Sequence, residues 1–323
     1  MPYDVVTLGE TMLRLTPPGA QLIEQSLSLT VHVGGSESNV AVGLARLGHR
    51  VAWLSRLTDN SLGRSISRAL QTHGVDVSHI TWTREDRVGL YFLEEGPPPR
   101  GSRVTYDRAG SAMSRIQPDD LPKDLFAAQA PAWLHVSGIS LAISRPAAQT
   151  TLAAAQRARA AGWHISFDVN HRAALWPPEA AANACEPLAE MADVVFLALR
   201  DAAALYNAPD EPDKALRHLQ KRWPAQTIVL TLGAAGAAGI SPGGDIVHQS
   251  AYPAHGSGRI GGGDAFVAGF LSSYQEANAL PSALMWGAAA AAYKYTLPGD
   301  MPLLDRNALQ AIMQQDGPRA LQR

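Results

Sequence analysis

The chain has only one cysteine, no excess of either charge and no long apolar run among its 323 residues. The single cysteine, Cys185, excludes an intramolecular disulfide and a metal site built from several thiolates, and it fits a reducing cytoplasm. A formal net charge of -2 gives no electrostatic basis for binding nucleic acid or an anionic membrane. Residues 1–6 lack the layout of a signal peptide, and no apolar stretch is long enough for a membrane span. We therefore expect a cytoplasmic protein that binds neither nucleic acid nor a membrane.

Segments that favour strands alternate with segments that favour helices along most of the chain. Hydrophobic residues make up 46% of the sequence, which is enough for a sizeable core. The alternation predicts an α/β fold with a mostly parallel sheet covered on both faces, and ligands of such sheets bind beyond the C-terminal ends of the strands. Strands are expected at 4–9, 51–54, 133–136, 165–168, 194–197 and 228–232, and helices at about 39–47, 62–70, 145–161, 262–276 and 281–295.

Two segments, about 11–33 and 88–116, interrupt this alternation because they carry β patterns with no helix between them. We expect them to pair into a small sheet that projects from the main body as a lid. A lid over the strand ends would exclude water from a ligand bound there. The whole chain, 1–323, is expected to form one domain with these two insertions.

Gly261-Gly262-Gly263-Asp264 leads directly into an apolar helical run. Glycines at a helix start leave backbone N–H groups accessible to a phosphate, and the helix dipole favours negative charge there. The adjacent carboxylate of Asp264 could act as a base in phosphoryl transfer to a hydroxyl. The alternative is structural: a glycine turn followed by an acidic residue that complements the helix dipole.

Gly34-Gly35-Ser36 and Asn39 precede and begin another expected helix. Paired glycines allow a ligand to approach the backbone, and the Asn39 amide offers both donors and an acceptor for a polyol. The alternative is that Ser36, Ser38 or Asn39 caps the helix.

Asp168-Val169-Asn170-His171-Arg172 follows an expected strand end. Asn170 and Arg172 are two residues apart and point the same way if the segment is extended, and an Arg fork suits a carboxylate or a phosphate. The alternative is an ion pair between Asp168 and Arg172 that holds a loop.

Tyr91, Tyr106 and Arg108 lie in the second β insertion. On one face of an extended segment, the phenol of Tyr106 and the guanidinium of Arg108 would make a second clamp for a carboxylate. The alternative is a solvated arginine on an exposed sheet.

Gly233 and Gly236 follow the strand expected at 228–232 and could lie against a nucleotide. The segment is not a Walker A loop, because no Gly-Lys-Ser/Thr follows, and the dinucleotide fingerprint is also absent. A plain turn between two strands would have the same sequence.

In this order, from Val6 to about Pro298, these motifs resemble the ribokinase-like (PfkB) sugar kinase family. The two blocks that resemble the family signatures are Gly34-Gly35…Asn39-x-Ala41…Ala45-Arg46-Leu47-Gly48 and Gly261-Gly262-Gly263-Asp264-Ala265-Phe266. Within the family the pattern is most similar to 2-keto-3-deoxygluconate kinases, on Gly34 to Glu37, Tyr91, Tyr106 to Ala112 and Asp168 to Trp176. The resemblance implies a three-layer sandwich with a β lid and ATP-dependent phosphorylation of the terminal hydroxyl of 2-keto-3-deoxygluconate.

The resemblance also implies roles for the matched residues. Asp264 would be the general base, and the N–H groups of Gly261 to Gly263 would form the anion hole. Mg²⁺ would bridge the ATP phosphates, held largely through water. The sugar acid would be held by Gly34, Gly35, Ser36, Asn39, Tyr91, Tyr106, Arg108, Asn170, Arg172 and Asp264, and ATP would be bordered by Thr231, Gly233, Gly236, Gly261 and Gly263.

Two departures from the family pattern concern metal ions. Gly258 stands where the family usually has an Asp that helps to bind a monovalent cation near the turn, which puts potassium activation in question. Ala198-Leu199-Arg200-Asp201 replaces the usual Asn-x-x-Glu, so that Asp201 is the one candidate acid near the metal.

Two other functions remain open at this point. A fructokinase or another neutral-sugar kinase would share the same base and anion hole. A non-catalytic sensor of sugar or nucleotide would explain the two departures. The resemblance further implies a homo-oligomer that pairs through the β lid, which would cover an exposed sheet edge.

Overall fold

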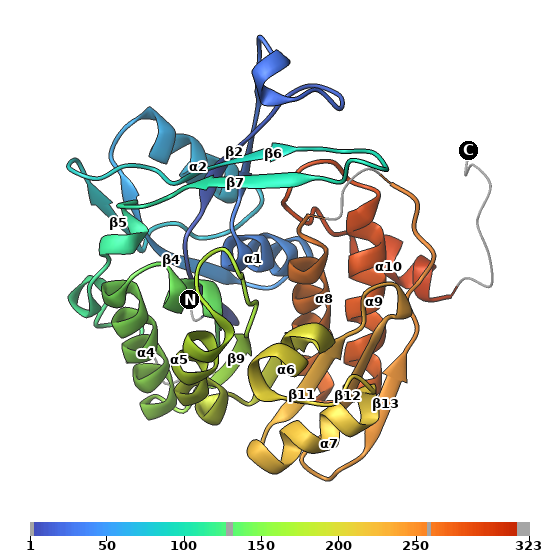
Figure 1. Cartoon of the computed structure of the whole chain (residues 1–323). Helices are drawn as coiled ribbons and strands as arrows, with labels where there is room; N and C mark the ends of the chain where they lie inside the picture. The colour runs from blue at the N-terminus through green and yellow to red at the C-terminus, as the bar shows by residue number, and fades with distance from the viewer. Residues whose placement is uncertain (1–2, 127–131, 257–259, 315–323) are drawn as a thin grey trace.

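A nine-stranded sheet runs through the middle of the molecule (Figure 1). The structure is a computed structural model that describes residues 3–126, 132–256 and 260–314. Neighbouring strands from β11 to β5 are parallel, whereas β12 and β13 run antiparallel at one edge. In spatial order the strands are β13 (Ile246–Gln249), β12 (Ala237–Ile240), β11 (Thr227–Thr231), β10 (Val194–Ala198), β9 (His164–Asp168), β8 (Trp133–Ser137), β1 (Val5–Leu8), β4 (Val51–Thr58) and β5 (Ile80–Thr83).

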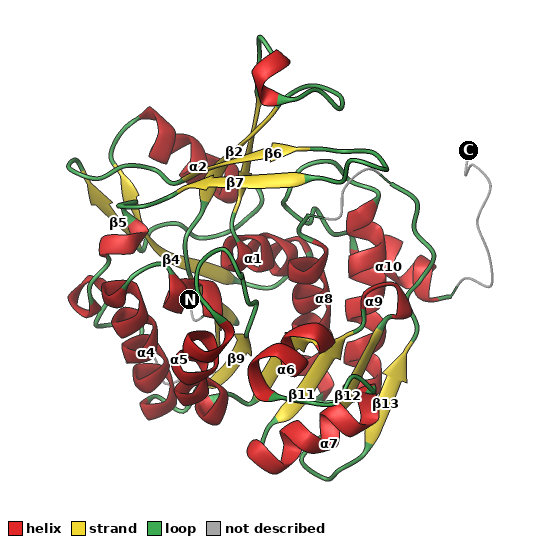
Figure 2. Cartoon of the chain, in the orientation of Figure 1, coloured by secondary structure: helices red, strands yellow, loops and turns green. Residues whose placement is uncertain are grey.

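Helices cover both faces of this sheet (Figure 2). On one face lie α1 (Ser36–Arg46), α2 (Ser61–Thr72), α8 (Gly262–Ala277), α9 (Leu280–Tyr295) and α10 (Arg306–Met313). On the other lie α3 (Gly138–Ala142), α4 (Arg145–Ala160), α5 (Pro178–Met191), α6 (Leu199–Tyr206) and α7 (Pro212–Arg222). Short 3₁₀ turns occur at Ile23–Gln25, Met113–Arg115, Pro118–Asp120 and Gly233–Ala235. None of the helices in the described ranges is long and apolar enough to cross a membrane.

The strands are apolar on both faces because each face is buried under helices. In β10, Val194 and Phe196 belong to the core under α8 and α9, whereas Val195 and Leu197 belong to the core on the α4 side. Two separate cores on one sheet make a three-layer sandwich, which confirms the predicted fold class.

A second, four-stranded sheet lies at one end of the molecule, beside α1 (Figure 1). Its order is β3 (Thr30–Gly34), β2 (Met12–Thr16), β6 (Leu90–Glu94) and β7 (Arg103–Asp107). The two central strands, β2 and β6, are parallel and come from different segments of the chain, while each outer strand pairs antiparallel with its neighbour. The small sheet expected from the sequence is therefore present.

Candidate active site

A cavity of about 520 Å³ opens where the C-terminal ends of the central strands meet the start of α8 and the small sheet. A second cavity of about 180 Å³ adjoins it, and Thr231 and Gly263 line both. The first cavity is lined by Gly34, Gly35, Ser36, Asn39, Tyr91, Tyr106, Arg108, Asn170, Arg172, Asp201, Thr231, Gly261, Gly263 and Asp264, and the second by Gly233, Gly236 and Gly262. Every site residue singled out from the sequence therefore lines one of two adjoining cavities.

The three glycines at the start of α8, Gly261 to Gly263, have different structural reasons to lack a side chain. Gly261 is the N-cap residue in a left-handed conformation, with φ of 77°, and a Cβ there would meet the Asp300 carbonyl oxygen at 2.2 Å. A Cβ on Gly262 would meet the Tyr295 ring at 2.4 Å. A Cβ on Gly263 would meet no protein atom within 4 Å, so this position faces open space. The backbone at the helix start is therefore accessible from both cavities, as an anion-binding site requires.

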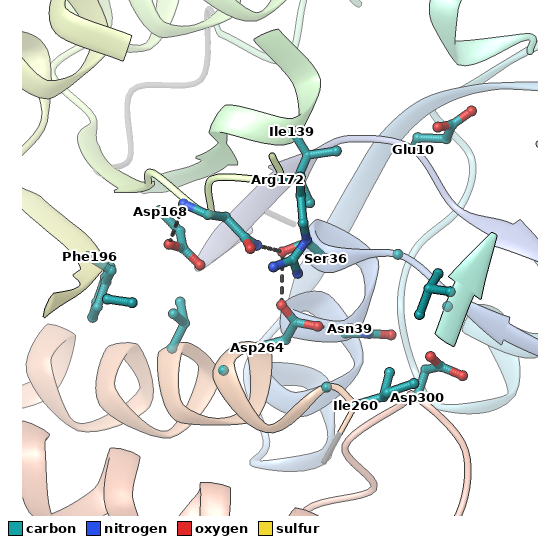
Figure 3. Close-up of a pocket in the computed structure, with 18 of the residues that line it drawn as sticks. Glu10, Ser36, Asn39, Ile139, Asp168, Arg172, Phe196, Ile260, Asp264 and Asp300 are labelled. Carbon is teal, nitrogen blue, oxygen red and sulfur yellow. Dashed lines mark hydrogen bonds between the residues drawn. The ribbon is translucent and has the colours of Figure 1, made fainter. Parts of the chain in front are cut away.

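Asp264 sits in the first turn of α8 and is held by two side chains of α1 (Figure 3). Ser36 Oγ donates to Asp264 Oδ1 at 2.8 Å, and Asn39 Nδ2 donates to Oδ2 at 2.7 Å. Gly35 is the N-cap of α1 and no side chain caps this helix, so the alternative that Ser36, Ser38 or Asn39 caps it is wrong. Burial raises the pKa of Asp264, while the two hydrogen bonds and the nearby Arg172 charge oppose that shift. The carboxylate is thus oriented and made more basic than an exposed aspartate.

The last residue of β9, Asp168, and the two residues Asn170 and Arg172 that follow it line the same cavity. Figure 3 labels Asp168 and Arg172 there. Asn170 adopts a left-handed conformation with φ of 40°, and its Nδ2 donates to Ser36 Oγ at 2.8 Å. Burial, together with the Asp264 charge, raises the pKa of Asp168 to about 8, although the Arg172 charge opposes this. Across the described residues no ion pair joins Asp168 to Arg172, so the alternative of an ion pair that holds the loop is wrong. The Arg172 guanidinium could therefore bind an anionic ligand.

Arg108 has a carboxylate partner that sequence reasoning missed. Its Nε donates to Glu10 Oε2 at 2.9 Å, and a second nitrogen, Nη2, donates to the same oxygen. The Arg108 side chain is only 9% exposed and lies 5.7 Å from the Tyr106 ring centroid, so the solvated-arginine alternative is wrong. Because Glu10 already neutralises this guanidinium, Arg108 is less suited than Arg172 to bind a substrate carboxylate.

Asp300, also missed from the sequence, joins the small sheet to the loop after α9. Tyr91 Oη donates to Asp300 Oδ1 at 2.5 Å, and Arg14 Nε lies 3.1 Å from Oδ2. Arg14 and Asp300 are both almost fully buried. The Asp300 main chain also packs against Gly261, so one residue contacts both the small sheet and the glycine turn.

The smaller cavity is mainly apolar where it lies between α8, α9 and the loop after β13. Its wall includes Phe266, Ala288, Ala291, Ala292 and Tyr252, to which the sequence analysis assigns no ligand role. Gly233 and Gly236 form the turn between β11 and β12, so they are at once a strand connection and part of the wall. Small side chains on one helix face leave a slot that is suited to a flat aromatic ring.

Residues for binding a metal ion are few. The described residues contain no group of three or more His, Cys, Asp or Glu side chains that could hold one. Asp201 lines the larger cavity, is 7% exposed, and has Arg200 Nε at 3.4 Å. A divalent ion here would rely on phosphate oxygens and water for most of its ligands, as Mg²⁺ commonly does. Gly258 lies outside the described residues.

Comparisons with known proteins agree with this geometry. A model of the pfkB family of carbohydrate kinases matches residues 3–306. A 2-dehydro-3-deoxygalactonokinase of Haloferax volcanii is 38% identical over 97% of each chain. The crystal structure of a 2-dehydro-3-deoxygluconokinase from Thermotoga maritima has a TM-score of 0.91 at 28% identity, covering 98% of this chain and 99% of that one. A Vibrio cholerae fructokinase double mutant, bound to fructose, ADP and a potassium ion, has a TM-score of 0.83 at 26% identity, covering 97% and 99%.

The family match covers most of the chain, and the relatives are matched over nearly their whole length. Carbohydrate kinases of this family bind a sugar and ATP and use a divalent metal ion. The chain therefore belongs to the pfkB family and is a carbohydrate kinase, as the sequence predicted.

Proposed function

We propose that this kinase transfers the γ-phosphoryl group of ATP to the terminal hydroxyl of a 2-keto-3-deoxy sugar acid. The observation that carries this proposal is the Asp264 carboxylate, which lines the larger cavity, is held by Ser36 and Asn39, and adjoins Gly263, an unobstructed glycine that lines both cavities. The names of the Haloferax volcanii and Thermotoga maritima relatives support the substrate class. The gluco acid and its galacto epimer are both candidates.

Asp264 would accept the proton of the sugar hydroxyl as that oxygen attacks the γ-phosphorus. Backbone N–H groups of Gly261 to Gly263 would donate to the oxygens of the transferred group, where negative charge accumulates. Mg²⁺, near Asp201, would neutralise charge on the ATP phosphates. The adenine would occupy the smaller, mainly apolar cavity beside α9. Thr231 and Gly263 line both cavities, so the phosphates of a nucleotide bound there could reach the glycine turn at 261–263.

The larger cavity also offers hydrogen-bond acceptors to the hydroxyl groups of a sugar. Within the described residues, Glu10 Oε1 and Asn39 Oδ1 are buried acceptors without a hydrogen-bond partner. Buried acceptors of this kind favour a ligand that donates hydrogen bonds. Both residues line the larger cavity, and the hydroxyl groups of a polyol could donate to these two oxygens.

Arg172 is proposed as the group that selects an acid over a neutral sugar. Substituting Arg172→Gln should raise the KM for the sugar acid by about tenfold or more, because a charge-assisted hydrogen bond is lost. The KM for fructose should change little in the same variant. If fructose is the better substrate of the wild type, or if the variant affects both sugars alike, the protein is a neutral-sugar kinase instead.

Asp264→Asn tests the catalytic role directly. ADP release should fall by about 10²- to 10⁴-fold, the usual contribution of a general base. Sugar binding measured by calorimetry should persist, and Asp245→Asn, at an exposed position, should behave as wild type. Unchanged turnover in Asp264→Asn contradicts the assignment of the base, and binding without any ADP release by the wild type favours the sensor.

We further propose that segments 11–33 and 88–116 form a lid on a single domain, and that two chains pair through this lid. Leu27, Val31 and Val104 are among the few exposed large apolar residues in the described chain, at 106%, 57% and 41% exposure, and all belong to these segments. Light scattering should give twice the monomer mass for the wild type and the monomer mass for Val31→Glu. A monomeric wild type contradicts the pairing.

A further inference from the structure

Lys294 is a buried cation that the kinase mechanism does not use. It belongs to the last turn of α9 and is 0% exposed. Its Nζ donates to the carbonyl oxygens of Leu297 at 3.2 Å and Gly299 at 3.0 Å. Among the described residues Lys294 forms no ion pair, and its hydrogen bonds go only to these main-chain carbonyls. Burial lowers the pKa of Lys294 and the Arg14 charge adds to that shift, whereas the nearby carboxylates of Asp300 and Asp264 oppose it and favour the charged ammonium.

This ammonium lies directly behind the glycine turn. A Cβ built on Gly261 would lie 3.4 Å from Lys294 Cε and 2.2 Å from the Asp300 carbonyl oxygen. The loop whose carbonyls bind Nζ therefore also packs against Gly261 and carries Asp300, the partner of Tyr91 and Arg14. Figure 1 shows α8 and α9 side by side, so that the end of α9 and the start of α8 meet at this loop.

Carbonyl oxygens grouped around a single positive charge are the ligands of an alkali cation as well as of an ammonium group. A potassium ion is present in the Vibrio cholerae fructokinase structure, and the sequence lacks the acid that the family usually places before the turn. Here the carbonyls beside the turn are taken by Nζ, and a second cation next to Lys294 would be repelled. The described residues beside the turn therefore do not fit a bound monovalent ion.

We propose that Lys294 is a built-in monovalent cation that holds the 297–299 carbonyls, positions the glycine turn, and makes the kinase independent of potassium. Lys294 is a positioning residue, since it acts through Gly261 and touches neither substrate. The proposal rests on the kinase activity proposed above, because its main measurement is the rate of phosphoryl transfer. Its fixed charge would also add to the positive potential at the site of the transferred phosphoryl group.

The test compares cation dependence in wild type, Lys294→Ala and Lys294→Met. Exchanging choline chloride for potassium chloride at equal ionic strength should change wild-type turnover by less than about twofold, since only general screening differs. Lys294→Ala in choline should lose about tenfold to a hundredfold in kcat with little change in the KM for the sugar, because a displaced turn weakens transition-state contacts. Potassium, ammonium or methylammonium should restore it, because the truncated side chain leaves room for a cation.

Lys294→Met is the matched control, because it keeps the apolar stem and leaves no room for a cation. It should stay slow in every salt, and a melting-temperature scan should show whether it is folded. Strong potassium activation of the wild type overturns the proposal, as does a folded Lys294→Ala with full turnover in choline. Recovery of Lys294→Met by potassium also contradicts it.

A nucleotide-binding measurement separates this proposal from the proposed function. ADP binding can be measured without sugar as the rise in melting temperature that ADP causes. Potassium should leave this rise unchanged in the wild type and should increase it in Lys294→Ala. If the wild type phosphorylates no sugar acid and this pattern still appears, the substrate assignment fails and the inference on Lys294 stands. If potassium raises the ADP effect in the wild type, the inference fails whatever the substrate is.

Discussion

Replacing Asp168 by asparagine should make the folded protein more resistant to alkaline conditions. Asp168 ends β9 at the wall of the larger cavity, and burial with the neighbouring Asp264 charge raises its pKa to about 8. An unfolded chain ionises the same group at a pKa of about 3.9. Between these values the folded protein keeps a proton that the unfolded chain has released, so stability falls as the pH rises.

The size of the effect follows from that difference in proton binding. The free energy of unfolding falls by about 1.4 kcal/mol per pH unit in this range, so that a change from about pH 5 to about pH 8 removes at most about 4 kcal/mol. Solvent at the cavity wall screens part of this, and we expect about 2 to 3 kcal/mol. Asparagine does not titrate, so Asp168→Asn should lack this component. Its Oδ1 can still accept the 3.1 Å hydrogen bond from the Asn170 N–H.

Urea denaturation of the ligand-free protein, followed by tryptophan fluorescence at several pH values, measures the effect. The difference in unfolding free energy between Asp168→Asn and wild type should grow in favour of the variant as the pH rises. Asp245→Asn, at an exposed position, should follow the wild-type curve. Parallel curves for wild type and Asp168→Asn would refute the reasoning, because Asp168 would then be ionised in the folded protein at neutral pH.

Two further predictions concern the turn and the base. Gly263→Ala should keep the wild-type melting temperature but lower kcat/KM for ATP, because its Cβ meets no protein atom and would enter the space beside the turn. Gly261→Ala should unfold at a lower temperature, because Gly261 has a positive φ and a Cβ there would lie 2.2 Å from the Asp300 carbonyl oxygen. Equal melting temperatures for the two variants would contradict this account of the turn. Asn39→Leu removes a hydrogen bond that lowers the pKa of Asp264, so the acid limb of the pH–rate profile should move to higher pH, and an unmoved limb would mean that another group limits the rate.

The sequence predicted well those features that depend on neighbours along the chain. The central strands were recognisable because both of their faces are buried, which makes β10 and β11 continuous apolar runs. The glycine turn before α8 was recognisable because helix starts and glycines have local signatures. Helix α5 was not predicted; it begins at Pro178 and contains Pro187, and prolines normally argue against a helix.

Contacts between residues that are far apart along the chain could not be predicted from the sequence. Arg108 was predicted to bind substrate, but its partner Glu10 is 98 positions away, and nothing in either local sequence announces the pairing. Asp300 follows α9 in a loop with no periodic pattern. Lys294, a single charge on an alanine-rich helix, looks like a solvent-facing residue until the loop after α9 folds back over it.

The strand order of the smaller sheet limits how chimeras of such kinases can be built. Its two central strands, β2 and β6, are parallel and come from different stretches of the chain. If only one stretch were exchanged, strands from two different proteins would have to pair in the middle of the sheet. Tyr91 and Arg14 also bind Asp300, which lies in neither stretch. A graft that transfers the cover of one enzyme to another must therefore carry three discontiguous pieces of sequence together.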